Sequence, residues 1–474
     1  MLWQKHSMTT YLLAVALCIC AAASTSSAQT VTVIYSLSEN SSYSGEAPSA
    51  ALVQGLNGSL YGTTTSGGEY GFGTVFAITT AGTLTTIYNF PQGQTPNGLL
   101  QSVNGTLYGT TQAGGTGTYG NGGTVFEITP AGTLTTIHNF CSVANCADGS
   151  QPIGNLVQTA NGDIYGTTYA GGTGGAGGGT LFQITPAGAF TTVASLGRAG
   201  LPESLVATAS GDLYFTGNGG YLYQFSPATG KLETVTQGST GFTSANTLIQ
   251  ASNGDFYGVT TWGATPETGI LFELTPEGAA TTIFSPLGNV YGAMVEATDG
   301  NIYGLSYNWS GGYLCGPDMG SSSGCGSIFS ATPAGSVNPD LYKFCTQNLE
   351  PGCPAYGPIG LIQATDGNLY GVTQGGDNLV PGSGSTVFKL SVGLGPFVET
   401  LQLSGKVGAS VYILGTGLRG TTAVSFNGTP ATSFTVNSTG SAIKAVIPTG
   451  ATTGTIQVTT PGGTLSSNAP FQIP

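Results

Sequence analysis

The chain has 474 residues, of which only 6% are charged, and its formal net charge is −13 at pH 7. Nucleic-acid binding requires clustered lysine and arginine side chains that replace phosphate counterions, so this composition argues against a nucleic-acid partner. The 79 glycines occur together with 39% hydrophobic residues. That combination favours short strands joined by many turns over disorder.

The N-terminus has the features of a secretory signal. Lys5 precedes an apolar run from Tyr11 to Ala23, and Ala28 supplies a small residue at which a signal peptidase can cut. We therefore expect residues 1–28 to be a signal peptide and the mature protein to be extracellular or held at the cell surface. No later run has the length and apolarity of a membrane helix, so we expect no transmembrane segment in the mature chain.

One phrase then recurs along the chain, for example "NGTLYGTT" from Asn104. Its copies are marked by Tyr61, Tyr108, Tyr165, Tyr214, Tyr257, Tyr303 and Tyr370. In the second unit the phrase lies between alternating runs at 98–103 and 106–111, and two more runs follow at 123–129 and 134–140. Asn-Gly between two alternating runs predicts a tight hairpin, because both turn residues need positive φ. We interpret the phrase as a hairpin corner that belongs to the scaffold.

Seven units of four short strands predict a β-propeller. The last unit has three such runs between residues 360 and 391 but lacks a fourth. Residues 30–37, "TVTVIYSL", resemble the fourth run of the first unit, "TLTTIYNF" at 83–90. An N-terminal strand in that place would leave no open edge at the junction. The predicted fold class is therefore all-β, with a seven-bladed β-propeller over residues 29–393 that is closed by the N-terminal strand.

The repeated unit, "NLYG(T/V)T" followed by "GTVF" and "TP.G", resembles the GloVer tandem repeat of predicted bacterial exported proteins. The resemblance covers residues 30–391 and implies a fold and an exported location, but no catalytic residues.

Residues 394–474 have a different pattern, with "SGKVGASVYILGTGL" at 404–418 and "AVSFNGTPA" at 423–431. They resemble an IPT/TIG domain, which implies an immunoglobulin-like β-sandwich that acts as a spacer or interaction module. The resemblance rests on Gly405, Gly408, Gly415, Gly417, Phe426, Asn427, Gly428, Pro448, Gly450 and Gly454.

Few side chains offer metal or catalytic chemistry. His138 is the single histidine of the mature chain and occupies the position that Tyr88 fills in the first unit, so we expect a half-buried aromatic residue on an outer strand. One histidine cannot build a His-rich copper or zinc site. The two arginines, Arg198 and Arg419, lie in different domains and cannot together hold a substrate carboxylate. We therefore expect no catalytic residue, no metal and no cofactor.

The acidic residues leave an alternative open. Glycoside hydrolysis needs two carboxylates that face each other across the scissile bond. Glu69, Glu267, Asp318 and Asp377 lie in the long loops after second strands and are the candidates for such a pair. Glu127 and Glu273 share one repeated position on the third strand and are expected to face solvent. The alternative function is thus a carbohydrate-active enzyme of the glycoside hydrolase type.

Six cysteines of the mature chain fall into close pairs: Cys141 and Cys146, Cys315 and Cys325, and Cys345 and Cys353. In an exported protein each pair most simply closes its own loop as a disulfide, although six cysteines allow fifteen connectivities.

The propeller topology sorts the connections onto two faces. Connections between strands one and two, and three and four, are short and form what we call the turn face. The other connections form the loop face, which holds the long segments 112–123, 141–153, 169–179, 304–326, 345–358 and 374–385. All six cysteines and the aromatic residues Trp262, Tyr307, Trp309, Tyr313 and Tyr356 are assigned to it. Because loops on a rigid scaffold commonly carry function, we hypothesise a non-catalytic exported protein whose loop face contacts a carbohydrate or another extracellular protein.

Overall fold

The computed structural model describes residues 29–37, 46–91, 93–173, 178–197, 202, 204–217, 221–236, 243–262, 269–285, 293–306, 326–344, 356–375 and 385–474. These residues form β-strands and one short 3-10 helix, η1 (Ala144–Cys146), with no α-helix among them. The all-β prediction is therefore confirmed for the described part of the chain. No helix in that part is long and apolar enough to cross a membrane. The expected signal peptide lies outside the described residues.

The second repeat unit illustrates how each phrase folds. Its strands are β7 (Pro96–Gln101), β8 (Leu107–Thr111), β9 (Thr124–Ile128) and β10 (Leu134–Asn139), in the antiparallel order β10-β9-β8-β7. Gly105 at the corner has a φ of 88°, a conformation that glycine adopts without a steric penalty. The predicted hairpin corner is therefore formed, but the predicted positive φ at both turn residues is wrong, because Gly105 has it and Asn104 does not. The corner is a longer turn, in which the Gly105 N–H donates to the Ser102 carbonyl oxygen at 3.0 Å and the Ser102 N–H donates to the Thr106 carbonyl oxygen at 3.0 Å.

The described residues of the repeats form seven sheets of this kind. The first contains β2 (Glu46–Pro48), β3 (Val53–Gln54), β4 (Leu60–Ser66), β5 (Thr74–Ile78) and β6 (Leu84–Asn89). The third contains β11 (Ser150–Gln158), β12 (Ile164–Ala170), β13 (Thr180–Ile184) and β14 (Phe190–Ser195). The fourth contains β15 (Leu205–Ala207), β16 (Leu213–Gly217), β17 (Tyr221–Ser226) and β18 (Lys231–Thr236).

The remaining sheets of the repeats follow in chain order. The fifth contains β19 (Thr243–Gln250), β20 (Phe256–Trp262), β21 (Ile270–Leu274) and β22 (Ala280–Phe284). The sixth contains β23 (Val295–Glu296), β24 (Ile302–Ser306), β25 (Ser327–Ala331) and β26 (Val337–Lys343). The seventh contains β27 (Tyr356–Gln363), β28 (Leu369–Gly375), β29 (Thr386–Ser391) and the N-terminal β1 (Thr30–Ser36).

The recurring tyrosine anchors the hairpin corner from inside. Tyr61 and Tyr370 are each only 1% exposed, and their hydroxyl groups bond to the corner residue four positions earlier. Asn57 donates to the Tyr61 hydroxyl at 2.9 Å, and the Tyr370 hydroxyl donates to Asp366 at 2.7 Å. A buried hydroxyl group needs such a partner. The phrase therefore serves the scaffold, as predicted.

The glycine after that tyrosine makes room for a ring from the third strand. A Cβ atom on Gly62 would lie 2.6 Å from the Cζ atom of Phe76, well inside van der Waals contact. In the fourth unit Phe215 replaces the glycine and Tyr223 replaces the phenylalanine. Their rings stack with centroids 5.3 Å apart. The two departures from the repeat pattern, Phe215 and Tyr223, therefore compensate each other.

Each pair of neighbouring sheets encloses an apolar core. Tyr61 and Phe90 of the first sheet, for example, pack with Leu99 and Phe126 of the second. Corresponding clusters join every later pair of sheets in chain order, and one more joins the seventh sheet to the first. The sheets therefore pack face to face in succession, which is the arrangement of a β-propeller.

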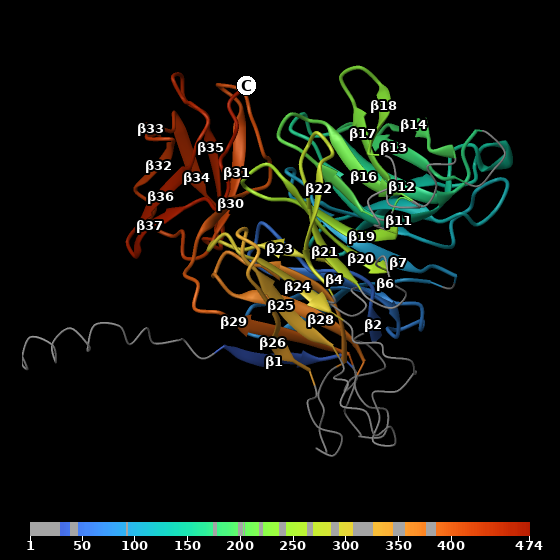
Figure 1. Ribbon diagram of the computed structural model, residues 1–474, viewed down its shortest axis with the longest axis horizontal. Helices are drawn as coiled ribbons and strands as arrows, with labels where there is room; N and C mark the ends of the chain where they lie inside the picture. The colour runs from blue at the N-terminus through green and yellow to red at the C-terminus, as the bar shows by residue number, and fades with distance from the viewer. Residues whose placement is uncertain are drawn as a thin grey trace, which may run out of the picture.

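The N-terminal strand pairs where the sequence predicted it. β1 is antiparallel to β29, with Thr30 opposite Ser391 and Ser36 opposite Thr386, and Figure 1 shows the two strands side by side. A second contact joins the same ends of the chain. Gln54 donates to the Thr365 hydroxyl at 3.0 Å and accepts from the Thr365 backbone N–H at 2.9 Å.

The C-terminal residues form two further four-stranded sheets around their own core. One contains β30 (Val398–Thr400), β31 (Ser410–Gly415), β34 (Ser433–Val436) and β35 (Ala442–Val446). The other contains β32 (Ala423–Phe426), β33 (Thr429–Pro430), β36 (Ile456–Thr460) and β37 (Gly463–Ser466). Between them lies an apolar cluster that includes Val411, Ile443 and Phe471. We call these residues the C-terminal module.

The C-terminal module rests on the turn face of the repeats. Asn437 and Ser441 each donate to the Leu56 carbonyl oxygen at 2.7 Å, in the corner between β3 and β4. The Ser404 hydroxyl donates to the Ala209 carbonyl oxygen, at 3.2 Å, in the corresponding corner of the fourth sheet. Figure 1 shows the module, in orange and red, at one side of the repeats. Its contacts therefore reach from the first sheet to the fourth.

Candidate binding face

Several exposed aromatic side chains lie on the loop face. Among the described residues, the large hydrophobic side chains that remain exposed are Tyr70, Tyr119, Val143, Tyr169, Tyr221, Leu403 and Val407. The first five belong to loop-face segments or to the strand ends beside them, in the first four units. Tyr70 is 54% exposed and Tyr119 is 59% exposed. Exposed aromatic groups on a rigid face are candidates for contact with a partner.

Most of the aromatic residues chosen from the sequence are outside the described residues. Tyr307, Trp309 and Tyr313 are outside the described residues. Trp262 ends β20 and Tyr356 begins β27, so both backbones lie at the loop face, while their side chains are outside the description. Their proposed role therefore stays a prediction. Sequence reasoning missed Tyr70, Tyr119, Tyr169 and Tyr221, whose signal was a tyrosine that falls outside the repeated phrase.

The loops that carry two of these tyrosines are fixed by asparagines at the ends of fourth strands. The Asn89 side-chain oxygen accepts from the Glu69 backbone N–H at 2.9 Å, directly before Tyr70. The Asn139 oxygen accepts from the Thr116 N–H at 2.9 Å. Because these bonds order the loops before any partner arrives, less entropy is lost on binding.

A disulfide-closed loop lies at the centre of this part of the face. Cys141 and Cys146 form a disulfide, as predicted, whereas Cys315, Cys325, Cys345 and Cys353 are outside the described residues. Six described non-glycine residues have positive φ, and four of them lie here: Cys141 at 60°, Asn145 at 59°, Cys146 at 49° and Gln151 at 55°. Such conformations cost roughly 1–3 kcal/mol each and persist only where the surroundings impose them.

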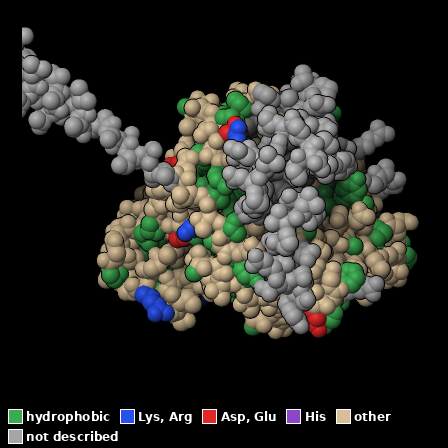
Figure 2. All heavy atoms as spheres, turned by 90° about the horizontal axis from the view of Figure 1, so that it is seen from below, with side chains coloured by type: hydrophobic (Ala, Val, Ile, Leu, Met, Phe, Trp, Pro, Cys, Tyr) green, Lys and Arg blue, Asp and Glu red, His purple; other side chains and the backbone are tan. Residues whose placement is uncertain are grey.

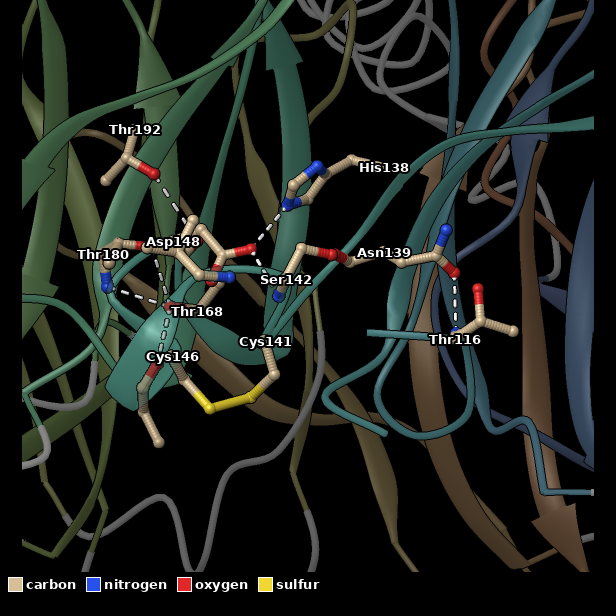
Figure 3. Close-up of polar contacts among 12 residues, drawn as sticks. Thr116, His138, Asn139, Cys141, Ser142, Cys146, Asp148, Thr168, Thr180 and Thr192 are labelled. Atoms are coloured by element: carbon tan, nitrogen blue, oxygen red, sulfur yellow. Dashed lines mark hydrogen bonds and ion pairs between the residues drawn. A yellow bond between two sulfur atoms is a disulfide. The ribbon is translucent and has the colours of Figure 1, made fainter. Parts of the chain in front are cut away.

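Asp148 lies two residues after the disulfide-closed loop and bonds to Ser142 of that loop and to His138, as Figure 3 shows. Its carboxylate is buried and accepts from the backbone N–H groups of Ser142 at 3.0 Å and Val143 at 3.2 Å. The His138 ring donates from Nε2 to the same carboxylate at 2.9 Å. These donors supply the hydrogen bonds that a buried polar group needs. Asp148 therefore ties the disulfide loop to the outer strand β10.

His138 has the structural role that its position in the repeat suggested. Its side chain is 17% exposed, and its ring stacks on Phe190 with centroids 3.6 Å apart. Burial lowers the pKa of His138, and the hydrogen bond and charge of Asp148 oppose that shift only in part. The ring is therefore neutral at pH 7. The prediction of a half-buried aromatic residue on an outer strand is confirmed.

Neighbouring loops dock on the disulfide loop from two sides. The Tyr119 N–H donates to the Cys141 carbonyl oxygen at 2.9 Å, and the Gly172 N–H donates to the Cys146 carbonyl oxygen at 3.0 Å. A Cβ atom on Gly122 would lie 3.0 Å from the Cys141 sulfur, so the first of these loops packs closely on the bridge. Tyr119 and Val143 thus project from adjoining segments of one braced surface.

The two faces differ in charge. Described acidic residues at turn-face corners and the strand ends beside them are Glu127, Asp163, Asp212, Asp255, Glu273, Glu277, Glu296, Asp299 and Asp366. Those at the loop face are fewer and include exposed Glu69, buried Asp148, and Asp340, which pairs with Lys343 at 2.9 Å. In Figure 2 charged side chains likewise appear singly or in small groups on the face that is displayed.

The acidic residues named from the sequence are only partly described. Of the four proposed loop acids, Glu69 is described and exposed, while Glu267, Asp318 and Asp377 lie outside the described residues. Glu127 and Glu273 were expected to face solvent, but both are half-buried. The Tyr257 hydroxyl donates to Glu273 at 2.5 Å, and burial, with that bond, raises the pKa of Tyr257 to about 12. At this third-strand position Glu273 therefore accepts a hydrogen bond from the recurring tyrosine of its own unit.

Two overlapping stretches, residues 23–220 and 202–440, match the sequence profile of the Gloeobacter/Verrucomicrobia repeat. The chain belongs to the Gloeobacter/Verrucomicrobia repeat family. The resemblance inferred from the repeated phrase is confirmed for the repeats, and the match continues past the last repeat strand into the C-terminal module. No curated protein matches the sequence of this repeat protein significantly.

Solved structures similar to the repeat protein are β-propeller enzymes. A streptogramin B lyase has a TM-score of 0.53 and 14% identity, covering 77% of this chain and 97% of its own. A catalytically inactive virginiamycin B lyase from Staphylococcus aureus with quinupristin has a TM-score of 0.53 and 14% identity, covering 77% and 99%. A fungal alcohol oxidase of the AA5 family in complex with copper has a TM-score of 0.53 and 13% identity, covering 94% and 98%.

At these identities the likeness concerns the fold alone. It supports the β-propeller architecture of the repeat protein and decides neither binding nor catalysis. Within the described residues of the repeat protein, no group of three or more His, Cys, Asp or Glu side chains is placed to hold a metal ion.

Proposed function

We propose that this protein is an exported, non-catalytic binding protein whose loop face recognises a carbohydrate. In this proposal residues 29–393 form a seven-bladed β-propeller closed by the N-terminal strand. Residues 394–474 form an immunoglobulin-like domain of the IPT/TIG type on the turn face. Residues 1–28 act as a signal peptide and are removed, which leaves the protein outside the cell or at its surface.

The observation that carries the proposal is the presence of exposed tyrosines on one face, two of them on loops that hydrogen bonds already order. Tyr70, Tyr119, Tyr169 and Tyr221 lie on one face. The loops of the first two are fixed by hydrogen bonds that oxygen atoms of Asn89, Asn139 and Cys141 accept. A tyrosine offers an apolar ring for stacking and a hydroxyl group for hydrogen bonding at a low cost in conformational entropy. The small number of described charges on this face favours a neutral glycan.

A glycan array with the mature protein tests the proposal. Tyr119→Ala and Tyr70→Ala should each weaken binding of a retained glycan by about 1–3 kcal/mol, or roughly 5- to 150-fold, as aromatic anchors do. Thr106→Ala, at a turn-face corner, and Val407→Ala, at an exposed apolar position of the C-terminal module, are the controls and should leave the affinity unchanged. Unchanged melting temperatures would show that the variants remain folded.

Two results would overturn the proposal. If the affinity ignores both tyrosines and follows changes within residues 394–474, the function belongs to the C-terminal module. If the retained glycan is cleaved, and cleavage is lost in Glu69→Gln but kept in Glu127→Gln, the alternative of a carbohydrate-active enzyme is correct. Glu69 is the informative acid because it is exposed directly beside Tyr70.

A further inference from the structure

A groove lies between the turn face and the C-terminal module, on the side opposite to the loop face. Its volume is about 640 Å³, within the range of small-ligand sites. Both parts of the protein line it, with Tyr214, Phe256 and Pro276 from the repeats and Leu403, Pro470 and Ile473 from the module. The groove therefore exists only while the module is docked.

The groove reflects an uneven fit between the two surfaces. Over the first sheet the module sits in direct contact, where Asn437 and Ser441 both bond to Leu56. Near the fourth sheet the bond from Ser404 to Ala209 marks the edge of the groove, since both residues line it. Beyond that bond the module and the corners of the fourth and fifth sheets enclose the groove.

The groove is lined mainly by apolar side chains and has one carboxylate, that of Glu296, in its wall. Glu296 lines it, and its carboxylate accepts from the Ser252 backbone N–H and hydroxyl group, both at 2.7 Å. None of the lining residues is lysine or arginine. Asp255 and Glu277 directly follow the lining residues Gly254 and Pro276 in the sequence.

The acids beside the groove repel one another. Burial, together with the charges of Glu273 and Glu277, raises the pKa of Asp255. A like charge disfavours the ionised form of a carboxyl group, so the negative potential at these corners is not fully neutralised by the protein itself. A ligand that brings positive charge would relieve it.

We propose that this groove binds an organic cation with an aliphatic body, of which an alkylammonium ion is the simplest member. The aliphatic body occupies the apolar floor formed by the valine, alanine, leucine and proline side chains, and the cationic group lies beside the Glu296 carboxylate. Opposite charges attract more strongly beside a partly apolar wall than in bulk water. The site is independent of the loop face and of any glycan bound there.

Three matched probes test the chemistry of the ligand with the full mature chain. Hexylammonium, hexanol and hexanoate each have six carbon atoms in an unbranched chain and differ in the head group and its charge. At low ionic strength, calorimetry should show that hexylammonium binds at least tenfold more tightly than hexanol, and that hexanoate binds more weakly than either. Added salt should weaken the hexylammonium complex selectively, because it screens the charge interaction.

Glu296→Gln removes the charge without breaking the scaffold. Gln54, Gln158 and Gln363 occupy the equivalent strand position in other sheets and make the same kind of bond to the neighbouring sheet. Glu296→Gln should lower the affinity for hexylammonium about tenfold and leave hexanol binding unchanged. Glu127→Gln, outside the groove, should change neither.

Ala469→Trp places a ring in the groove and should abolish binding of both hexylammonium and hexanol. Equal affinities for hexylammonium and hexanol would overturn the proposal, and so would a Glu296→Gln variant that keeps the preference for the cation. Binding that survives in a folded Ala469→Trp variant, or no binding of hexylammonium at all, would also refute it.

Discussion

Replacing Gly109 by alanine would place a methyl group where a phenylalanine ring already lies. The new Cβ atom would be 2.5 Å from Cζ of Phe126 and 2.9 Å from Cδ2 of Leu99, whereas carbon atoms pack favourably at about 3.5–4.0 Å. Both neighbours are buried, at 1% and 6% exposure, so neither ring nor methyl group can move into solvent. Overpacking of this kind costs about 1–3 kcal/mol.

Urea denaturation of Gly109→Ala against the parent measures the loss, and two further variants identify its cause. Gly395→Ala is the control, because a Cβ atom there has no neighbour within 4 Å and should leave the free energy of unfolding unchanged or slightly higher. Phe126→Leu combined with Gly109→Ala should cost less than the two single changes added together, since a smaller side chain accommodates the methyl group. A Gly109→Ala variant as stable as Gly395→Ala would refute the reasoning.

Three other changes test the pairing of β1 with the seventh sheet, the disulfide-closed loop at 141–146 and the C-terminal module. Deleting residues 30–36 should leave β29 with an unpaired edge and lower the midpoint of thermal unfolding by several degrees; an unchanged midpoint would contradict the closure of the ring. Changing Cys141 and Cys146 together to serine should cost about 2 kcal/mol in urea denaturation, because a six-residue loop loses its cross-link; no loss would mean that Asp148 alone holds the loop. Burial raises the pKa of Glu399 to about 7 from an ordinary value of 4.5, so its ionisation lowers stability as pH rises through that interval. Glu399→Gln should then be more stable than the parent at pH 8, by up to about 3 kcal/mol, and equally stable below pH 4.5; a difference that does not depend on pH would exclude this origin.

Local chemistry accounts for what the sequence predicts well. Positive φ at the glycine of each Asn-Gly or Asp-Gly corner and alternation of period two determine a hairpin within about fifteen residues, so the strands around Tyr108 follow from their own segment. The pairing of residues 30–37 with the last unit could be predicted because the two ends of the repeat are complementary in pattern. The hairpins depend on local contacts, whereas the pairing of β1 with β29 is long-range and could be predicted only from the number of strands in the repeats.

What could not be predicted depends on contacts between distant segments. Gln54 meets Thr365, and nothing in the segment around Gln54 names that partner. The exposure of Tyr119 depends on how its loop docks on Cys141, and that docking is a tertiary contact between two separate segments. The contact of Ser441 with Leu56 likewise depends on two surfaces that meet only after each has folded.

The pairing of β1 with β29 also sets an order in time for folding. β1 is made first, but its partner ends at Ser391, and synthesis at 5–20 residues per second delays that partner by about 20–70 s. During this interval the backbone N–H and C=O groups of β1 have no strand to pair with, and an unpaired strand is a template for another chain. At high concentration β1 of one molecule would therefore complete the seventh sheet of a second, and the expected misassembled product is a strand-swapped oligomer built from the same hydrogen bonds as the monomer.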